Sequence, residues 1–423
     1  MKRLACLALC CTMLFALCGC GSMFSEEYVV VGEYTPPAPI SDSGEGRITV
    51  TDLYGLRLAL LGLVSDGVRE SSIAFDADYE GEISEDMASA CWQVRTQDAL
   101  CAYCVENISY DLTKIVNYTE ARISIRYSDA VCAPEEVLRR TYSSGMDELV
   151  RKMMTAGDTR LAVLISSSYT GEEGMEELVR NAYREEPILS PRAPEISVMM
   201  LSGSGTQRLY EIDLDYGMEE AERQRRLEEL HALSPFEGME ITGLDEAHRA
   251  LAATLWLSEH CVYDPEGNSD LYSALIRGCA DEEGMAFAFV HLCTLLGLDC
   301  RMVYGQRSWE DYCWNIVSVD GDYYHVAPAV CAGGDLDGGF LIRDELMWED
   351  CRWDVSAYPP CTGELSWYFL QVQDGLIEPE PPAEEETAEE AGLSGEETPQ
   401  EGIIEESGEE DVPEEVETDE INP

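Results

Sequence analysis

The segment from Glu282 to Leu296 constrains the fold more than any other part of the chain. After its two glutamates it reads GMAFAFVHLCTLL, so almost every face of the expected helix is apolar. A helix that is apolar all round has no face to present to water and must be buried in a larger structure. Gly297 supplies the positive φ angle at which such a helix can end. The chain must therefore provide a sheet or further helices that enclose this segment.

Strand patterns follow this helix directly. Residues 300–304, 313–319 and 323–326 carry the apolar runs and alternations typical of β-strands. The dipeptide Asp320-Gly321 between the last two ranges strongly favours a two-residue hairpin turn. Residues 251–260 form a further expected helix. Together these patterns predict a buried helix that lies against an antiparallel sheet.

This order of elements resembles the transglutaminase-like superfamily, a branch of the papain-like cysteine enzymes. Short stretches match the family's motifs in one register, namely residues 272–275, 284–286, 295–300, 303–305, 314–317, 320–321 and 323–326, with trailing matches at 340–344, 352–354 and 358–359. The resemblance covers about a quarter of the chain. It implies an α+β fold with a papain/transglutaminase-like core in residues 246–376.

The same resemblance locates the positions of the family's catalytic triad. The family has a cysteine at the start of the buried helix, a histidine at the start of a strand and an aspartate after the next strand. Here these positions hold Glu282, Tyr312 and Ala327. Glutamate supplies no sulfur for a thioester, tyrosine with a pKa near 10 is no base at neutral pH, and alanine orients nothing. The resemblance therefore implies a transglutaminase-like pseudoenzyme.

The substitutions leave a binding role open, because a groove does not need the triad to keep its shape. We expect Met285 and Trp314 to pack its walls, with no catalytic residue, cofactor or metal. A peptide, protein or cell-wall ligand would suit such a groove by analogy with the family. The chain would then be a binding or scaffold module, and a purely structural spacer is a further alternative.

An enzyme with relocated residues is the competing interpretation. Cys279 precedes Glu282 by three positions, and His325 shares a strand face with Ala327 because side chains alternate along a strand. A remodelled loop would bring Cys279 and His325 together in a cysteine peptidase or amide-forming transferase. In the simpler interpretation Cys279 is paired or buried and His325 is a partly exposed sheet residue.

The acidic start of the buried helix also has two interpretations. Asp281, Glu282 and Glu283 place negative charges on its first turn, where they stabilise the helix dipole by ~0.3 to 1 kcal/mol each. Glu282 with Tyr312 stays open as an acid and acceptor in some other hydrolysis. We favour the structural interpretation of these carboxylates.

The first twenty residues determine the expected compartment. Lys2 and Arg3 precede an apolar run over residues 4–17, which is too short to span ~30 Å of hydrocarbon but is typical of a secretory signal. The run ends in Leu-Cys-Gly-Cys, which resembles the bacterial lipobox, so we expect lipid on Cys20. Residues 1–19 would be the signal peptide, and the chain would be anchored to the extracytoplasmic face of a bacterial cell membrane. A plain secretory signal is the alternative.

The remaining segments complete the expected organisation. Residues 20–46 are rich in Pro, Ser and Gly and read as a tether, while residues 47–245 alternate helices and strands in a separate N-terminal α+β domain. Within it a helix is expected over residues 134–156. A faint repeat relates residues 73–82 to 163–172, which either a duplication or convergent turn chemistry explains.

Cysteine spacing argues against metal sites. Of 17 cysteines, twelve follow Cys20, and some disulfides are expected outside the membrane. Residues 261–361 contain no CxxC pair of the zinc-ribbon type, and the single CxxC at 101–104 lies in an expected helix. A structural zinc and thioredoxin-like chemistry are therefore disfavoured.

The net charge of −57, from 84 acidic and 27 basic residues, excludes nucleic acid as a partner. Residues 377–423 contain 20 acidic residues and no lysine or arginine, and we expect a disordered acidic tail there. The expected partners are therefore the membrane, through lipid on Cys20, and a peptide or protein ligand.

Overall fold

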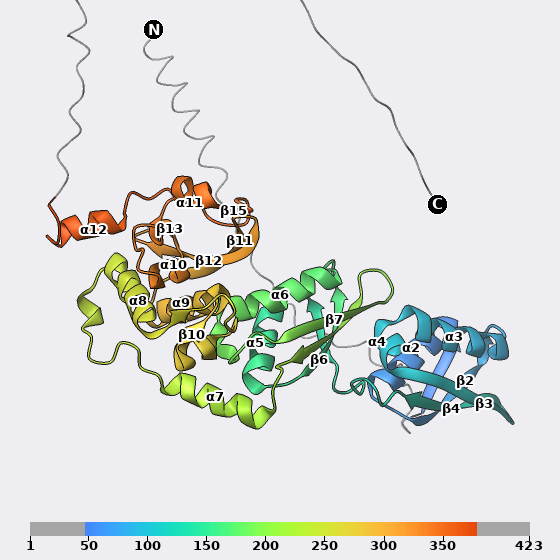
Figure 1. Ribbon diagram of the computed structural model, residues 1–423. Coiled ribbons are helices and arrows are strands. Elements are labelled where there is room, and N and C mark those ends of the chain that lie inside the picture. The colour runs from blue at the N-terminus through green and yellow to red at the C-terminus, as the bar shows by residue number, and fades with distance from the viewer. Residues whose placement is uncertain (1–46, 379–423) are drawn as a thin grey trace, which may run out of the picture.

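The computed structural model describes residues 47–378, which form four sheets and the helices that cover them (Figure 1). The expected signal peptide, Cys20, the tether and nearly all of the acidic tail lie outside the described residues. Within residues 47–378 no helix has both the length and the apolar character needed to cross a membrane.

The first unit is a four-stranded sheet with helices on it. Its elements are β1 (Ile48–Asp52), α2 (Leu53–Ser65), β2 (Glu70–Glu80), α3 (Ile83–Gln97), α4 (Ala99–Cys104), β3 (Val105–Ile115) and β4 (Tyr118–Tyr127), and the strand order is β1-β2-β4-β3. Asp52 ends β1 and caps α2, because its Oδ1 accepts a hydrogen bond of 2.7 Å from the Gly55 amide. Asp52 thus marks both the end of β1 and the start of α2.

The second unit repeats this plan. It comprises β5 (Leu138–Tyr142), α5 (Met146–Ala156), β6 (Arg160–Ser167), α6 (Glu172–Glu185), the short 3₁₀ helix η1 (Pro187–Leu189), β7 (Glu195–Ser202) and β8 (Arg208–Asp215), with strand order β5-β6-β8-β7. The expected helix over residues 134–156 is wrong in its first half. Gly145, with a φ of 76°, separates a strand from the helix, and the strand forms because β6 offers it a parallel partner.

The two units correspond in register as well as in strand order. Ile48 pairs with Ile73 across the parallel strands β1 and β2, and Leu138 pairs with Val163 across β5 and β6, each residue 90 positions after its counterpart. In both units the second strand then pairs antiparallel with the last strand. The faint sequence repeat thus falls on equivalent strands, which favours a duplication over convergent turns.

The third part holds the buried helix. It begins with α7 (Glu220–Ala232), the 3₁₀ helix η2 (Ile241–Gly243) and α8 (Glu246–His260), followed by β9 (Val262–Tyr263), the π-helical turn η3 (Ser273–Arg277), β10 (Cys279–Ala280) and α9 (Glu282–Leu295). Then come β11 (Cys300–Arg307), β12 (Glu310–Val319), β13 (Asp322–Val326), α10 (Pro328–Ala332), β14 (Phe340–Ile342), α11 (Asp344–Asp350), β15 (Cys351–Trp353) and α12 (Trp367–Gln373). An antiparallel five-stranded sheet results, with order β14-β13-β12-β11-β15.

The predicted core is confirmed in detail. Residues 285–290 of α9 are each at most 1% exposed. The Asn315 side chain on β12 donates a 3.1 Å hydrogen bond to the Ala286 carbonyl, so this face of the sheet meets α9. The turn between β12 and β13 has positive φ angles at Asp320 and Gly321, as the Asp-Gly signal predicts.

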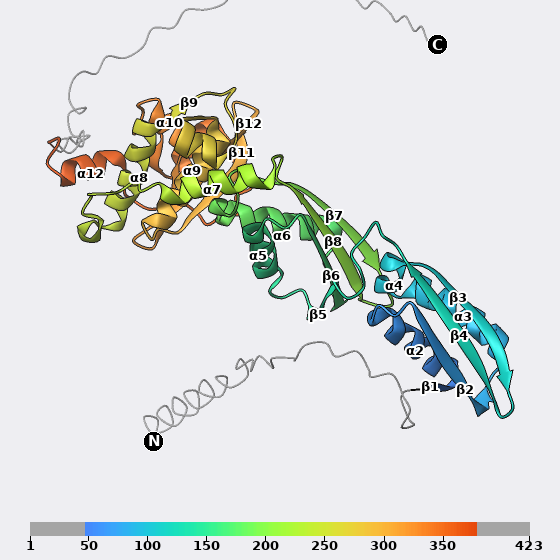
Figure 2. The same cartoon turned by 90° about the horizontal axis from the view of Figure 1, so that it is seen from below.

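Three groups of buried side chains hold these parts together. The second sheet contributes to two of them: Ala162 and Leu164 pack with the core of the first unit, while Val163 and Ile165 pack with the core that includes α9. Figure 2 shows the second unit between the first unit and the five-stranded sheet. A third, smaller group covers the face of the five-stranded sheet that points away from α9.

The cysteines do not form the expected disulfides. All twelve in the described part are free, and most are buried. Several lie within helices or strands of the cores, where a small apolar side chain is what packing requires.

Candidate functional site

Two adjoining cavities lie where α9 begins beside the start of β12. The first has a volume of about 400 Å³ and is lined by Ser269, Asp281, Glu282, Glu283, Tyr304, Gly305, Asp311, Tyr312 and Cys313. The second, of about 240 Å³, is lined by Arg307, Tyr312, Ala327, Val330, Asp337, Gly338, Ile342, Leu346, Met347, Glu349, Asp350 and Cys351. Because Tyr312 belongs to both, we call the two cavities together the Tyr312 groove.

The Tyr312 groove gathers the three positions that the family register assigns to a triad. Glu282 and Tyr312 line the first cavity, and Tyr312 and Ala327 line the second. These residues come from the start of α9, from β12 and from the end of β13. Positions up to 45 residues apart in the sequence therefore line two cavities that share Tyr312.

The start of α9 is fixed by its own polar residues. The Asp281 Oδ1 accepts a 2.9 Å hydrogen bond from the Gly284 amide and caps the helix. Gly284 has no room for a side chain, because a Cβ would lie 2.7 Å from the Asn268 carbonyl oxygen. Tyr263 donates a 3.3 Å hydrogen bond to Glu282 at the groove surface. Asp281 thus has the structural role that we expected for the carboxylates at the start of α9, while Glu282 lines the cavity.

Glu283 is the more buried of the two glutamates. Tyr304 on β11 donates a 3.0 Å hydrogen bond to its Oε1, and burial raises the pKa of Glu283 above the usual value. Its side chain lines the first cavity of the groove. No signal in the sequence distinguishes it from Glu282.

Tyr312 is suited to shape the groove rather than to move protons. Its ring stacks on Trp314, with 6.0 Å between ring centroids, and the Arg307 guanidinium lies 5.5 Å from its centroid. Burial raises the pKa of Tyr312 well above that of a free phenol. The phenol therefore stays protonated at neutral pH and cannot serve as a general base.

Most of the ionisable side chains that line the groove are acidic. Seven carboxylates line it, from Asp281, Glu282, Glu283, Asp311, Asp337, Glu349 and Asp350. Arg307 is the one basic side chain among the described residues that line it, and it lies 3.6 Å from Asp350. A groove of this composition attracts cations and repels anions.

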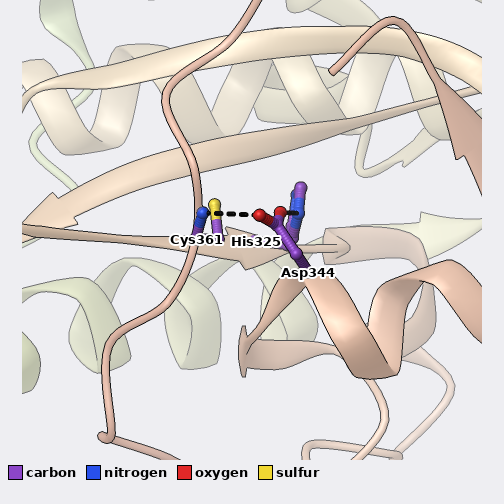
Figure 3. A group of neighbouring side chains, drawn as sticks. All are labelled: His325, Asp344 and Cys361. Atoms are coloured by element: carbon purple, nitrogen blue, oxygen red, sulfur yellow. Dashed lines mark hydrogen bonds and ion pairs between the residues drawn. The ribbon is translucent and has the colours of Figure 1, made fainter. Parts of the chain in front are cut away.

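A second group of reactive residue types lies on the side of the five-stranded sheet that points away from α9 (Figure 3). The Trp314 Nε1–H donates to His325 Nδ1 at 2.9 Å, and His325 Nε2 lies 2.9 Å from Asp344 Oδ1. The Cys361 amide donates to the other Asp344 oxygen at 3.0 Å. Since the indole N–H can only donate, Nδ1 must accept, so the ring proton sits on Nε2 and faces Asp344.

This arrangement does not fit a metal site. Ligand atoms of His325, Asp344 and Cys361 lie within 4.8 Å of one another. A metal on His325 Nε2 would replace the proton there, and a neutral ring would then carry its proton on Nδ1, against the Trp314 donor. Burial also raises the pKa of the Cys361 thiol, which disfavours the thiolate that a metal needs. The three residues form a structural hydrogen-bond relay.

The alternative pair of Cys279 and His325 is not assembled. His325 is fully buried, which corrects the expectation of a partly exposed residue, because α11 and the segment around Cys361 cover that face of the sheet. Both of its ring nitrogens are engaged, by Trp314 and Asp344. Cys279 lies on β10 with its thiol 3.9 Å from Asp264 Oδ2, half-buried and unpaired.

Met285 and Trp314 do not form the groove walls that we expected. Both are fully buried and line neither cavity. Met285 packs in the core around α9, and Trp314 packs on the opposite face of the sheet beneath Tyr312. Both are buried because large apolar side chains gain more from complete burial than from lining a polar surface, and Trp314 supports the Tyr312 ring by stacking on it.

One buried and one half-buried histidine, His325 and His291, predict a loss of stability in mild acid. Burial lowers the pKa of His325 and lowers that of His291 on α9 to about 4, whereas an unfolded histidine titrates near 6.5. Below pH 6.5 the unfolded chain binds the extra protons, so the free energy of unfolding falls until the folded histidines also titrate. From pH 7 to pH 5, His291 alone should cost about 2 kcal/mol.

Urea unfolding at the two pH values measures this effect. The variant His291→Gln should lose about 2 kcal/mol less than the parent chain on going to pH 5. His260→Gln, at an exposed position on α8, is the matched control and should lose as much as the parent. An unchanged pH dependence in His291→Gln would show that His291 is not buried as a neutral ring.

Comparisons with known proteins bear on the third part of the chain. Residues 238–344 match the family model of the transglutaminase-like superfamily. A solved structure of a TGase is similar with 13% identity and a TM-score of 0.23, over 53% of this chain and 66% of that one. A candidate cysteine protease from Cytophaga hutchinsonii is similar with 9% identity and a TM-score of 0.22, over 40% of this chain and 80% of that one. No curated protein matches.

Proposed function

Since residues 238–344 form a transglutaminase-like domain, we propose that this domain is a binding module without the family's catalysis. Its ligand is a basic peptide or a basic segment of a protein in the cell wall, bound in the Tyr312 groove. A lipid on Cys20 would hold the module at the outer face of a bacterial cell membrane. The observation that carries this proposal is the set of side chains at the triad positions, Glu282, Tyr312 and Ala327, around one groove.

The chemistry of these side chains supports binding over acyl transfer. Acyl transfer by this family begins with a thiolate that an adjacent imidazole activates. Cys313 is the sulfur nearest to Tyr312 in sequence, and burial raises the pKa of its thiol well above the usual value. Cys351, in the second cavity, is buried as well, and its pKa is also raised by burial. Neither thiol is activated.

Charge complementarity selects the ligand class. The seven carboxylates of the groove come from segments around residues 281–283, 311, 337 and 349–350, so negative charge runs along its whole length. Lysine or arginine side chains of an extended peptide would meet a carboxylate at each step. Amino groups of a cell-wall peptide have the same chemistry.

Trp309 presents an exposed aromatic side chain in the turn that connects two groove residues, Arg307 and Asp311. It forms the β11–β12 turn with Ser308, at φ angles of 70° and 53°, and its side chain is 84% exposed. The flanking Arg307 and Asp311 line the two cavities. Holding a tryptophan in the left-handed region costs ~1 to 2 kcal/mol, and such strain concentrates at ligand-binding positions.

Fluorescence anisotropy with labelled ten-residue peptides tests the proposal. A peptide of alternating Lys and Ala should bind in the micromolar to millimolar range and more weakly as salt is added, while the same peptide with Glu in place of Lys should not bind. The double variant Glu282→Gln, Asp311→Asn should weaken binding about tenfold. The control Asp66→Asn, Asp78→Asn removes two exposed carboxylates of the first unit. If both double variants lost the same affinity for the peptide, the effect would come from the overall charge of the chain. Binding in the Tyr312 groove would then be refuted.

The substitution Trp309→Gly separates binding from stability. Glycine accepts the positive φ angle, so the free energy of unfolding should stay unchanged or rise by up to about 1 kcal/mol. Binding of the Lys–Ala peptide should weaken about three- to tenfold, because the cation loses an aromatic face. Trp92→Ala on α3, which removes another exposed tryptophan, should leave binding unchanged. Unaltered affinity of the Trp309→Gly chain would exclude the turn from the binding surface.

A further inference from the structure

A third cavity lies where the second unit meets the transglutaminase-like domain. Its volume is about 180 Å³, and it is lined by Arg180, Tyr183, Arg184, Ala193, Pro194, Ile196, Glu283, Phe287 and Tyr304. These residues come from α6, from the segment leading into β7, from α9 and from β11. Ala193, Pro194, Ile196 and Phe287 supply apolar walls. We call it the α6–α9 cavity.

One polar group at this cavity has no hydrogen-bond partner among residues 47–378. Tyr183 is only 2% exposed, and its hydroxyl is buried without a hydrogen-bond partner. Its ring packs edge-on against Phe287, with 4.9 Å between centroids. Buried hydroxyls nearly always have a partner, because an unpaired one keeps the whole cost of its lost water. An acceptor atom of a bound molecule would satisfy it.

Two arginines line the cavity, whereas the Tyr312 groove is lined mainly by carboxylates. Arg184 lies with its guanidinium carbon 3.9 Å from the Tyr304 ring centroid, and Arg180 lies one helical turn earlier. Both also bond to glutamates of α6: Arg180 to Glu176 and Glu177, and Arg184 to Glu177. A guanidinium has five donors, so each arginine keeps donors for a further acceptor.

Glu283 is the one carboxyl-bearing residue among those of the described chain that line the cavity. Glu283 accepts a hydrogen bond from Tyr304, and burial raises the pKa of its carboxyl group above the usual value. In a chain with 84 acidic and 27 basic residues, the lining of this cavity holds two guanidinium groups and one carboxyl group. Planar carboxylates match the fork of donors that arginine presents.

We propose that the α6–α9 cavity binds a small organic carboxylate with an apolar body. The arginines and the Tyr183 hydroxyl would take the carboxylate, and Phe287 with Pro194 would contact the body. The volume is below the usual range for drug-sized ligands, which limits the body to a short aliphatic chain or one ring. The site does not depend on what the Tyr312 groove binds, although Glu283 and Tyr304 line both.

Ligand-observed NMR on the full chain tests this site with butyrate, benzoate and phenylacetate as probes. At least one of the three should bind with a Kd below about 10 mM, and its amide should bind at least tenfold more weakly. Inorganic phosphate should not compete. Failure of all three carboxylates, equal binding of the amide, or competition by phosphate at the same concentration would overturn the assignment.

The variant Tyr183→Phe distinguishes an effect on carboxylate binding from an effect on folding. It removes a hydroxyl that has no partner in the structure, so thermal unfolding should be unchanged or occur at a higher temperature. Affinity for the bound carboxylate should fall at least fivefold, and Arg184→Gln should lower it further. Arg151→Gln is the control, because Arg151 on α5 also pairs with two glutamates, Glu185 and Glu186, but does not line the cavity. Equal affinity in Tyr183→Phe and the parent, or an equal loss in Arg151→Gln, would contradict the proposal.

Discussion

The triple variant E282C/Y312H/A327D should acquire a thiol that reacts with iodoacetamide at pH 6 about 10 to 100 times faster than the single variant E282C. In the single variant the new thiol has an ordinary pKa near 8.5 and is almost fully protonated at pH 6. In the triple variant an imidazolium beside it, oriented by a carboxylate, would favour the thiolate. The large ratio is expected because all three positions line the same groove.

Peptide mapping by mass spectrometry gives the rate at position 282 separately from the twelve natural cysteines. The variant E282S/Y312H/A327D should show no label on that peptide. Equal rates in the single and triple variants would mean that the three positions do not form a triad. The register on which the pseudoenzyme interpretation depends would then be wrong.

The substitution Asp344→Ala should lower the free energy of unfolding by about 2 to 4 kcal/mol. Asp344 accepts hydrogen bonds from the buried His325 ring and from the Cys361 amide. Without it both donors stay buried and unpaired, and the connection between β13 and the segment around Cys361 is lost. Chemical unfolding of the parent and the variant at pH 7 measures the difference.

Glu345→Ala is the matched control for this experiment. Glu345 follows Asp344 on the first turn of α11 but is exposed. Its removal should change the free energy of unfolding by no more than about 0.5 kcal/mol. A small effect of Asp344→Ala, equal to that of the control, would show that the relay with His325 contributes nothing to the fold.

The parts of the fold that the sequence predicts best are those specified locally. The apolar composition of residues 282–296 requires burial wherever the helix lies, and Asp320-Gly321 favours its turn without help from the rest of the chain. The strand β5 was not predicted, because the sequence LRRTY alone has no strong strand pattern. The strand forms by pairing with β6, which lies later in the sequence. Local sequence patterns predict most helices and strands, and strand pairing determines the structure of segments whose pattern is ambiguous.

The candidate site was predictable only where the family's motifs gave a register. Glu282, Tyr312 and Ala327 were placed by motif spacing and line one groove. Asp344 could not be linked to His325, because a strand periodicity carries no information about a helix start 19 residues later. Asp311 and Trp309 have one signal in the sequence, a polar turn between two strands, and that signal does not say what the turn faces.

The most direct test of the account is intact-mass spectrometry of the parent chain after incubation with a labelled peptide that contains both Lys and Gln. We expect reversible binding that dilution or added salt abolishes, with the masses of chain and peptide unchanged after a day. A covalent adduct on any cysteine, or a peptide that has been cleaved, deamidated or cross-linked, would contradict a domain that binds without catalysis.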